Sequence, residues 1–394
     1  MKNLIDEFGS PLYVYDEGTI NRQIAQMKSG IPYKDVLFCY AMKANSNLAI
    51  LKTMQRSGLG VDCVSKGELI LALKAGFNPS VIRFTPTFAS REEIAFAAQH
   101  QAQITLDSIG LLDWFTDEFP DAPIGLRMNP SVMAGAYEKT STGHAKAKFG
   151  LAMDYVDDIQ ERVSQKNIKI NGLHIHSGSD ILEIDQFMAA VEVLLKVAPL
   201  FKSLEYIDLG SGFKVPYFDG DKETDIVVLG QMVSQRFNLF CEDYGRPLRL
   251  VFEPGKFLVS KSGHFLVTCT GVKENGGITF AGVDSGFNHL IRPMFYGAYH
   301  TIRNISNPEA TLHKYDIVGN ICETDTFASD RMVPQIRPGD ILSFENAGAY
   351  CYSMASSYNT RPKPAEVYLR IDGTTQLIRR RETVEDILAL QVGD

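Results

Sequence analysis

Eight short β-rich runs alternate with longer helix-forming segments between about residues 36 and 255, and this alternation constrains the fold more than any other feature. The intervening segments, such as 67–75 and 184–197, carry apolar residues at the three-to-four spacing of helices. Strand and helix repeated eight times in series predict an α/β chain with a (β/α)8 barrel of the TIM type. The runs are Val36 to Tyr40, Gly60 to Val64, Val81 to Thr85, Gln103 to Leu106, Ile124 to Met128, Ile170 to His176, Tyr206 to Leu209 and Leu248 to Phe252.

The texture of the sequence changes after about residue 260. Helical periodicity fades, and β-rich stretches such as 264–271, 340–344 and 365–371 are separated by turn residues. A chain of 394 residues also exceeds what one hydrophobic core usually holds. We therefore expect a barrel over 26–265 and a second, mostly β domain of sandwich or barrel type, built from 1–25 and 266–394.

Composition excludes several classes of protein. The net charge of −8 argues against a nucleic-acid partner, and no apolar run approaches the ~18 residues of a membrane span. The acidic N-terminal segment is unlike a signal peptide, and the six cysteines form no CxxC pair. These features predict a cytoplasmic protein with reduced thiols.

Polar residues stand repeatedly at the C-terminal ends of the predicted barrel strands, which is where such barrels carry their chemistry. Lys43 follows the first run directly. A buried ammonium is costly unless it is paired or its pKa falls, and a lysine of lowered pKa can form a Schiff base with a carbonyl or with pyridoxal phosphate. The alternative is a lysine that extends to the rim of the sheet. The other residues at strand ends are Asp62, Arg127, His176, Ser179, Gly210, Ser211, Gly212, Glu253 and Gly255.

Glycines at three strand ends predict a phosphate-binding cup. The turn Gly210-Ser211-Gly212 is weak evidence alone, because tight turns use glycine for geometry as well. Together with Gly178-Ser179 and Gly255, it becomes a credible cradle for an anion.

Glu253 could hold the nitrogen of a pyridine ring protonated, so that the ring withdraws electrons, or it could simply pair with Arg127 or Lys43. His176 could stack on such a ring. His174 and His176 also form an HxH pair like those of metal-dependent hydrolases, but no other histidine lies at a predicted strand end. We predict no metal site.

The stretch 131–150 lacks apolar periodicity and is rich in small and polar residues. A loop of this length in a compact domain is usually functional, so we expect a lid over the barrel mouth.

These motifs resemble the fold-type III pyridoxal-phosphate decarboxylases, whose barrel is like that of alanine racemase, and among them the diaminopimelate decarboxylases. The resemblance covers nearly the whole chain. The matching segments are Tyr40 to Asn45, Val61 to Leu69, Leu173 to Ser179, Asp208 to Gly212, Glu253 to Lys256, Arg292 to His300, Gly319 to Glu323, Gly348 to Tyr350 and Tyr358 to Pro362.

The resemblance implies a pyridoxal 5'-phosphate enzyme that decarboxylates meso-2,6-diaminopimelate to L-lysine. Lys43 would bond covalently to the cofactor, with Asp62 and Arg127 as support; His176 would pack on the ring, and Glu253 would pair with the pyridine nitrogen. Ser179, the turn of Gly210, Ser211 and Gly212, Gly255, Lys256 and Tyr350 would surround the phosphate or substrate.

In the second domain, the resemblance implies that Arg292, Tyr296 and Glu323 recognise the distal amino-acid end of the substrate, since Arg suits a carboxylate and Glu an ammonium. Cys322 would protonate the carbanion after carbon dioxide leaves; without the resemblance it reads as a small core residue. The Cys322 loop of the family reaches the partner's barrel, which implies a homodimer with shared active sites.

Two departures from the family pattern bear on the substrate. Lys256 stands where the family has arginine, and the loop after Glu323 is one residue shorter, which could move Asp325 relative to a ligand. The alternative substrates are carboxynorspermidine and ornithine-like amino acids. A further alternative is a binding protein that keeps the fold without turnover.

Overall fold

The computed structural model describes residues 1–132, 143–144 and 147–393, which form two compact units. The barrel unit comprises Gln23–Val215 and Lys222–Leu258. The second unit comprises Met1–Arg22, Pro216–Asp221 and Val259–Asp394. The domain limits expected at 26 and 265 stay a prediction, because compactness alone does not define an independently folding domain.

The barrel unit contains a closed ring of eight parallel strands, as predicted. The strand order is β5-β4-β3-β2-β10-β9-β8-β6, and pairing of β5 with β6 closes the ring. A two-residue strand, β7 (Leu151–Ala152), pairs with β6 outside the ring. The ring strands are β2 (Val36–Ala41), β3 (Gly60–Cys63), β4 (Ile82–Phe84), β5 (Gln103–Leu106), β6 (Ile124–Asn129), β8 (Ile170–His174), β9 (Tyr206–Asp208) and β10 (Arg249–Phe252).

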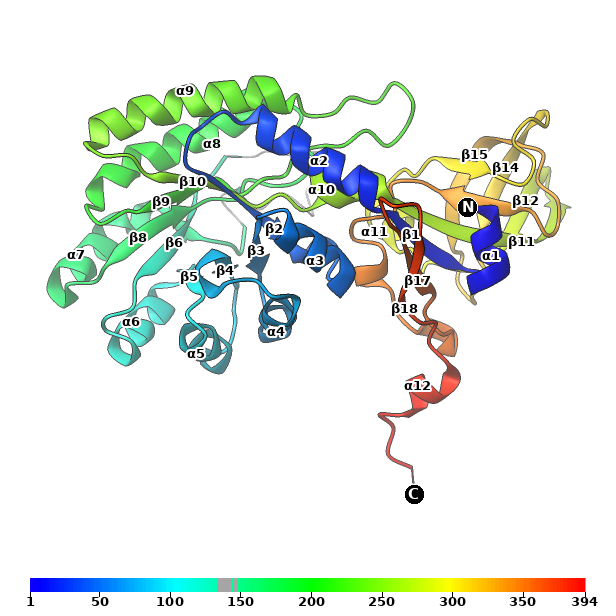
Figure 1. Cartoon of the computed structure of the whole chain (residues 1–394), viewed down its shortest axis with the longest axis horizontal. Coiled ribbons are helices and arrows are strands. Elements are labelled where there is room, and N and C mark those ends of the chain that lie inside the picture. The colour runs from blue at the N-terminus through cyan, green and yellow to red at the C-terminus, as the bar shows by residue number, and fades with distance from the viewer. Residues whose placement is uncertain (133–142, 145–146, 394) are drawn as a thin grey trace. The chain divides into compact units, whose positions relative to one another are not determined.

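Helices surround this ring on the outside (Figure 1). Several begin at polar caps that satisfy their first N–H groups: Asn47, Ser65 and Ser90 accept hydrogen bonds from backbone amides of the first turn. The helices are α2 (Glu17–Gly30), α3 (Leu48–Arg56), α4 (Lys66–Ala75), α5 (Arg91–Gln99), α6 (Ile109–Glu118), α7 (Val156–Lys166), α8 (Ile184–Val197), α9 (Ile226–Tyr244) and the short α10 (Lys256–Val259).

The interior of the barrel is filled by side chains and is not a pore. The ring of Tyr206 lies inside, and a Cβ on Gly172 would come within 2.0 Å of it, so glycine at this position makes room for the ring. The guanidinium of Arg83 stacks on the same ring at 4.1 Å from its centroid. This packed layer leaves the strand ends as the place for chemistry.

The second unit is mostly β, as predicted, and its strands form a nine-stranded mixed sheet. Strand β1 (Leu12–Asp16) lies between β11 (Gly263–Asn275) and β17 (Ala365–Leu369), so the N-terminal segment completes this sheet. The other elements are β12 (Ile278–Val283), β13 (Ile302–Asn304), β14 (Leu312–Val318), β15 (Thr326–Pro334), β16 (Ile341–Phe344), β18 (Thr375–Arg379), α1 (Lys2–Phe8), α11 (Arg292–Tyr296) and α12 (Val384–Leu388).

Among the described residues, no helix combines the length and the apolar composition needed to cross a bilayer. Most of the predicted lid over 131–150 lies outside the described residues, namely 133–142 and 145–146.

Candidate active site

Lys43 lies at the C-terminal end of β2, in the short 3-10 helix Met42–Ala44. Its Nζ is 3.4 Å from Oδ2 of Asp62 on β3, and its side chain is 40% exposed whereas that of Asp62 is fully buried. The Thr85 hydroxyl donates to the other Asp62 oxygen. Burial raises the pKa of Asp62, although Lys43 and Thr85 act in the opposite direction. At this strand end, the partly exposed amino group of Lys43 is therefore held by the buried carboxylate of Asp62.

Glu253 lies at the end of β10 and pairs with His174 of β8, with 3.0 Å between Oε2 and Nε2. Both side chains are buried. Burial alone would raise the pKa of Glu253, but His174 and Lys43 outweigh burial and hold this pKa far below its ordinary value. Oε1 of Glu253 accepts no hydrogen bond from the residues that the structure describes. Glu253 is thus an ionised carboxylate with one oxygen available to a ligand.

His174 contacts Glu253 after β10, whereas His176 contacts the turn that follows β9. Its Nδ1 accepts a hydrogen bond from the backbone N–H of Ser211 at 3.4 Å. Burial, followed by the charges of Lys43 and Arg127, lowers the pKa of His176 well below its ordinary value. The imidazole is therefore neutral at physiological pH.

Arg127 is buried at the end of β6. Its guanidinium lies over the ring of Phe149, 4.7 Å from the centroid. Burial lowers its pKa, while the carboxylates of Glu253 and Asp107 act in the opposite direction. Arg127 therefore contributes positive charge to the same end of the barrel.

The segments of the predicted phosphate cup do come together. Gly210 and Gly212 have positive φ, and a Cβ on Gly212 would lie 2.1 Å from the carbonyl oxygen of Gly178. The turn thus packs directly against the segment that carries Ser179, which is half-buried. Gly255 sits close to the end of β2, where an added Cβ would lie 3.2 Å from Ala41.

Lys256 forms a buried ion pair that the sequence did not reveal. Its Nζ is 2.7 Å from Oδ2 of Asp180, and the two side chains are only 10% and 5% exposed. Asp180 itself adopts a left-handed backbone conformation with φ 59°. The pair ties the loop after β8 to the first residue of α10.

His174, Asp208 and Glu253 bring three potential metal ligands within 4.8 Å of one another. Two of these ligand atoms already share the hydrogen bond between His174 and Glu253. Burial, followed by the charge of Glu253, raises the pKa of Asp208 well above its ordinary value, which disfavours a second carboxylate anion in this cluster.

The predicted substrate residues Arg292 and Tyr296 lie at the two ends of α11 in the second unit. Arg292 is buried; its Nη2 donates to the Tyr217 hydroxyl at 3.0 Å, and its Nη1 lies 3.4 Å from Nε2 of His300. Burial and the arginine charge lower the pKa of His300 to about 3. A neutral histidine and a tyrosine thus hold the guanidinium in place.

Tyr350, the other aromatic residue predicted for this unit, is half-buried and has a left-handed backbone with φ 57°. It follows Gly348, where a Cβ would lie 1.8 Å from the carbonyl oxygen of Val259. The close approach of the two backbones fixes the turn that carries Tyr350.

Cys322 and Glu323 are exposed in the loop between β14 and β15. The Tyr358 hydroxyl donates to Glu323 Oε1 at 2.8 Å and lies 3.5 Å from Cys322 Sγ. Hydrogen bonds from Tyr358 and Asn359 lower the pKa of the Cys322 thiol. Asp325 is buried inside this loop, so the shorter loop does not turn its side chain outward.

Sequence reasoning assigned no such contact to several residues that touch the predicted ones, among them His174, Asp180, Tyr217, Tyr358 and Asn359. The HxH pattern did single out His174, but only as a possible metal ligand. Tyr358 and Asn359 were part of a recognised motif without a role. Asp180 and Tyr217 carry no signal in the linear sequence, because each acquires its partner only through the fold.

Comparison with known proteins places these residues in context. Residues 17–260 match the family model of the pyridoxal-binding domain of pyridoxal-dependent decarboxylases. The diaminopimelate decarboxylase of Methanothermobacter thermautotrophicus is 38% identical over 98% of this chain and 92% of its own length. That of Escherichia coli K12 is 34% identical over 98% and 94%.

Solved structures agree with the sequence relatives. The crystal structure of diaminopimelate decarboxylase from Helicobacter pylori, complexed with L-lysine, matches with a TM-score of 0.90 and 31% identity. The match covers 99% of this chain and 98% of that one. The likeness therefore extends over both units.

The barrel end also fits pyridoxal phosphate on its own chemistry. That cofactor requires a lysine, an acceptor for its protonated ring nitrogen and a cradle for its phosphate. Lys43 could supply the first, the available Oε1 of ionised Glu253 the second, and the glycine turn at 210–212 the third. With these residues, and with relatives that match it from end to end, the chain belongs to the diaminopimelate decarboxylase family of pyridoxal-dependent decarboxylases.

Proposed function

We propose that this protein decarboxylates meso-2,6-diaminopimelate to L-lysine and carbon dioxide with pyridoxal 5'-phosphate as cofactor. The observation that carries the proposal is the buried, ionised Glu253, whose Oε1 faces no described donor at the same barrel end as the Lys43–Asp62 pair. When bound, the cofactor supplies an electron-withdrawing ring that accepts the electrons left at the α-carbon.

The barrel residues would orient the cofactor and set its charge. Glu253 would keep a proton on the ring nitrogen, and His174 would hold the carboxylate in place. A neutral His176 suits packing against an aromatic ring, because it adds no positive charge there. Asp62 would position the Lys43 amine. Arg127, Ser179, Gly210, Ser211, Gly212 and Gly255 would line the remainder of the cofactor site.

The second unit would recognise the distal end of the substrate. Because Tyr217 and His300 hold its guanidinium in place, Arg292 would be a fixed hydrogen-bond donor to a substrate carboxylate. Glu323 would bind the distal ammonium, with Tyr296 and Tyr350 beside it. The L-lysine bound to the Helicobacter pylori enzyme carries one amino-acid group and a terminal amine, as expected of the product, and this supports a substrate with an amino-acid group at its distal end.

Because Lys256 replaces the arginine of the family, carboxynorspermidine and ornithine-like amino acids stay as alternative substrates. A lysine in a buried ion pair offers less to a substrate carboxylate than the fork of an arginine.

The test of the substrate is a direct assay. We expect purified protein with pyridoxal phosphate to release carbon dioxide and L-lysine from meso-diaminopimelate. L-ornithine, L-lysine and carboxynorspermidine should react more slowly, and Lys43→Ala should give no product. Faster release from any of these three would overturn the substrate assignment.

The proposal includes a homodimer in which the exposed Cys322 loop of one protomer completes the barrel site of the other. Coexpression of two impaired variants, Lys43→Ala and Cys322→Ala, then restores about a quarter of wild-type activity, because half of the dimers carry one intact site. Activity no higher than that of either variant alone would argue against shared sites.

All six cysteines are free, which supports the cytoplasmic location expected from the sequence.

A further inference from the structure

The side-chain amide of Asn359 contacts Cys322 at two atoms. Its Oδ1 accepts the backbone N–H of Cys322 at 3.0 Å, and its Nδ2 donates to Sγ at 3.2 Å. Because the oxygen is committed to the backbone N–H, the amide N–H must face the sulfur. The side chain of Asn359 therefore holds the backbone of Cys322 and also places a hydrogen-bond donor beside its sulfur.

The backbone at Asn359 is shaped for this contact. Its φ is 56°, a left-handed conformation that asparagine tolerates better than most residues. The preceding Tyr358 stacks on Phe287, with ring centroids 5.6 Å apart, and donates to Glu323. The two neighbours thus hold both residues of the Cys322-Glu323 pair.

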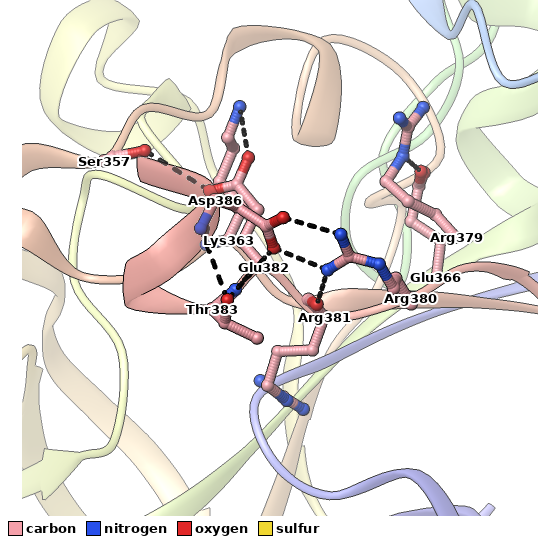
Figure 2. A network of polar contacts seen from close by, with 9 residues as sticks. All are labelled: Ser357, Lys363, Glu366, Arg379, Arg380, Arg381, Glu382, Thr383 and Asp386. Atoms are coloured by element: carbon pink, nitrogen blue, oxygen red, sulfur yellow. Dashed lines mark hydrogen bonds and ion pairs between the residues drawn. The ribbon is translucent and has the colours of Figure 1, made fainter. Parts of the chain in front are cut away.

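A single carboxylate brackets the segment that carries Tyr358 and Asn359. Glu382 accepts hydrogen bonds from the Ser357 hydroxyl at 3.3 Å and from the Lys363 backbone N–H at 3.1 Å, and it pairs with Lys363 Nζ at 3.0 Å. Figure 2 shows Glu382 among the polar contacts of the C-terminal segment, next to the pairing of Arg380 with Asp386. Glu382 therefore fixes both ends of segment 357–363.

We infer that Asn359 is a positioning residue for Cys322, whose amide N–H stabilises the thiolate left when Cys322 gives up its proton, and that Glu382 acts on Cys322 at a distance by holding segment 357–363. The inference deepens the proposed function, because it assumes that Cys322 is the proton donor. The proton leaves Sγ for the substrate's α-carbon, and the thiolate later takes a proton from water.

The test measures the thiol itself and not turnover. The rate of alkylation of Cys322 by iodoacetamide is followed against pH in the full-length protein loaded with pyridoxal phosphate. The other five cysteines are buried, and Cys322→Ala gives the blank. Tyr358 and Glu323, the titratable groups that act on the thiol, are unchanged in all variants compared.

Two substitutions of Asn359 distinguish the effect of its amide N–H from the effect of its backbone conformation and its contact with the Cys322 N–H. Asn359→Gly accepts the left-handed backbone but removes the amide. Asn359→Asp keeps the oxygen that holds the Cys322 N–H and puts a second oxygen where Nδ2 faces the sulfur. We expect the alkylation rate at pH 7 to fall about threefold for glycine, on the scale of an ordinary hydrogen bond, and about tenfold for aspartate, on the scale of a hydrogen bond to a charged group. The midpoint of both profiles should move to higher pH.

An aspartate variant that reacts as fast as wild type overturns the inference, because a purely structural contact would survive this change. Circular dichroism and cofactor absorbance establish that each variant is folded. These outcomes do not depend on the substrate, so a protein that failed to decarboxylate diaminopimelate would still report on Asn359.

Glu382→Ala tests the longer-range part, with Asp386→Ala as the matched control in the same network. Glu382→Ala should slow alkylation about twofold, whereas Asp386→Ala, which contacts Arg380 and Thr383 but not segment 357–363, should leave it unchanged. Equal effects from the two variants would remove Glu382 from the inference.

Discussion

The barrel end and the Cys322 loop both gather ionisable side chains, but they set the charge of those side chains by different means. At the barrel end, burial is the largest influence on the pKa values of Asp62 and His176, whereas at Glu253 the charges of His174 and Lys43 outweigh burial. At Cys322, which is exposed, hydrogen bonds from Tyr358 and Asn359 come first. The barrel cluster thus depends on the whole sheet around it, whereas the loop depends on two neighbouring side chains.

This difference predicts how each region responds to substitution. A change at the barrel end should alter cofactor binding or stability together with activity. A substitution of Cys322 should alter turnover alone, because its side chain is exposed and its thiol contacts only the exposed groups of Tyr358 and Asn359.

The largest expected effect is that of Lys43→Ala. Loss of the amine should remove the visible absorbance of the covalently bound cofactor and lower kcat by at least about 10⁴-fold, as is typical when a covalent catalyst is lost. Absorbance spectra and steady-state assays provide the measurement. Lys66→Ala, which removes a surface lysine paired with Glu92, serves as the control. Retained absorbance in Lys43→Ala would show that another lysine binds the cofactor.

Cys322→Ala provides the opposite half of the comparison. We expect kcat to fall by about 10³-fold, within the usual range for a general acid, while cofactor absorbance stays the same. Both quantities can be measured on one protein sample. A loss of absorbance would mean that the loop contributes to cofactor binding, and a wild-type kcat would remove Cys322 from the reaction.

The barrel and the ends of its strands could be predicted from the sequence, because parallel strands read as apolar runs that alternate with helical periodicity. Lys43 and Glu253 followed from position at those ends. Boundaries were less accurate: the sixth run was expected to reach His176, but β8 ends at His174.

The partners of these residues could not be predicted. The protein partner expected as the alternative for Glu253 was Arg127 or Lys43, but the residue it pairs with is His174, 79 positions away. Lys256 meets Asp180 across 76 positions. Such pairs depend on side-chain directions at neighbouring strand ends, and sequence spacing contains no information about them.

The buried ion pair of Lys256 and Asp180 should contribute to the stability of the barrel unit. Lys256→Met leaves Asp180 buried opposite an apolar group and should lower the free energy of unfolding by about 3 kcal/mol. Adding Asp180→Asn should restore more than half of that loss. Chemical unfolding of both single variants and the double variant gives the coupling. Losses that simply add would mean that the two groups do not stabilise each other. Lys66→Met, at an exposed pair, should cost less than about 1 kcal/mol.

The smallest expected effect concerns Asp325, the buried carboxylate inside the Cys322 loop. Burial raises its pKa to about 6, although backbone N–H groups of the loop oppose the shift. Between about pH 4 and pH 6 the folded protein therefore holds a proton that the unfolded chain has lost, so this group makes stability fall as pH rises through that window. Asp325→Asn does not titrate. The free energy of unfolding of this variant minus that of wild type should accordingly increase by about 2 kcal/mol from pH 4 to pH 7. A difference that stays constant with pH would mean that the loop accommodates the ionised carboxylate, and that its shape, like the reactivity of Cys322, is set by hydrogen bonds and not by burial.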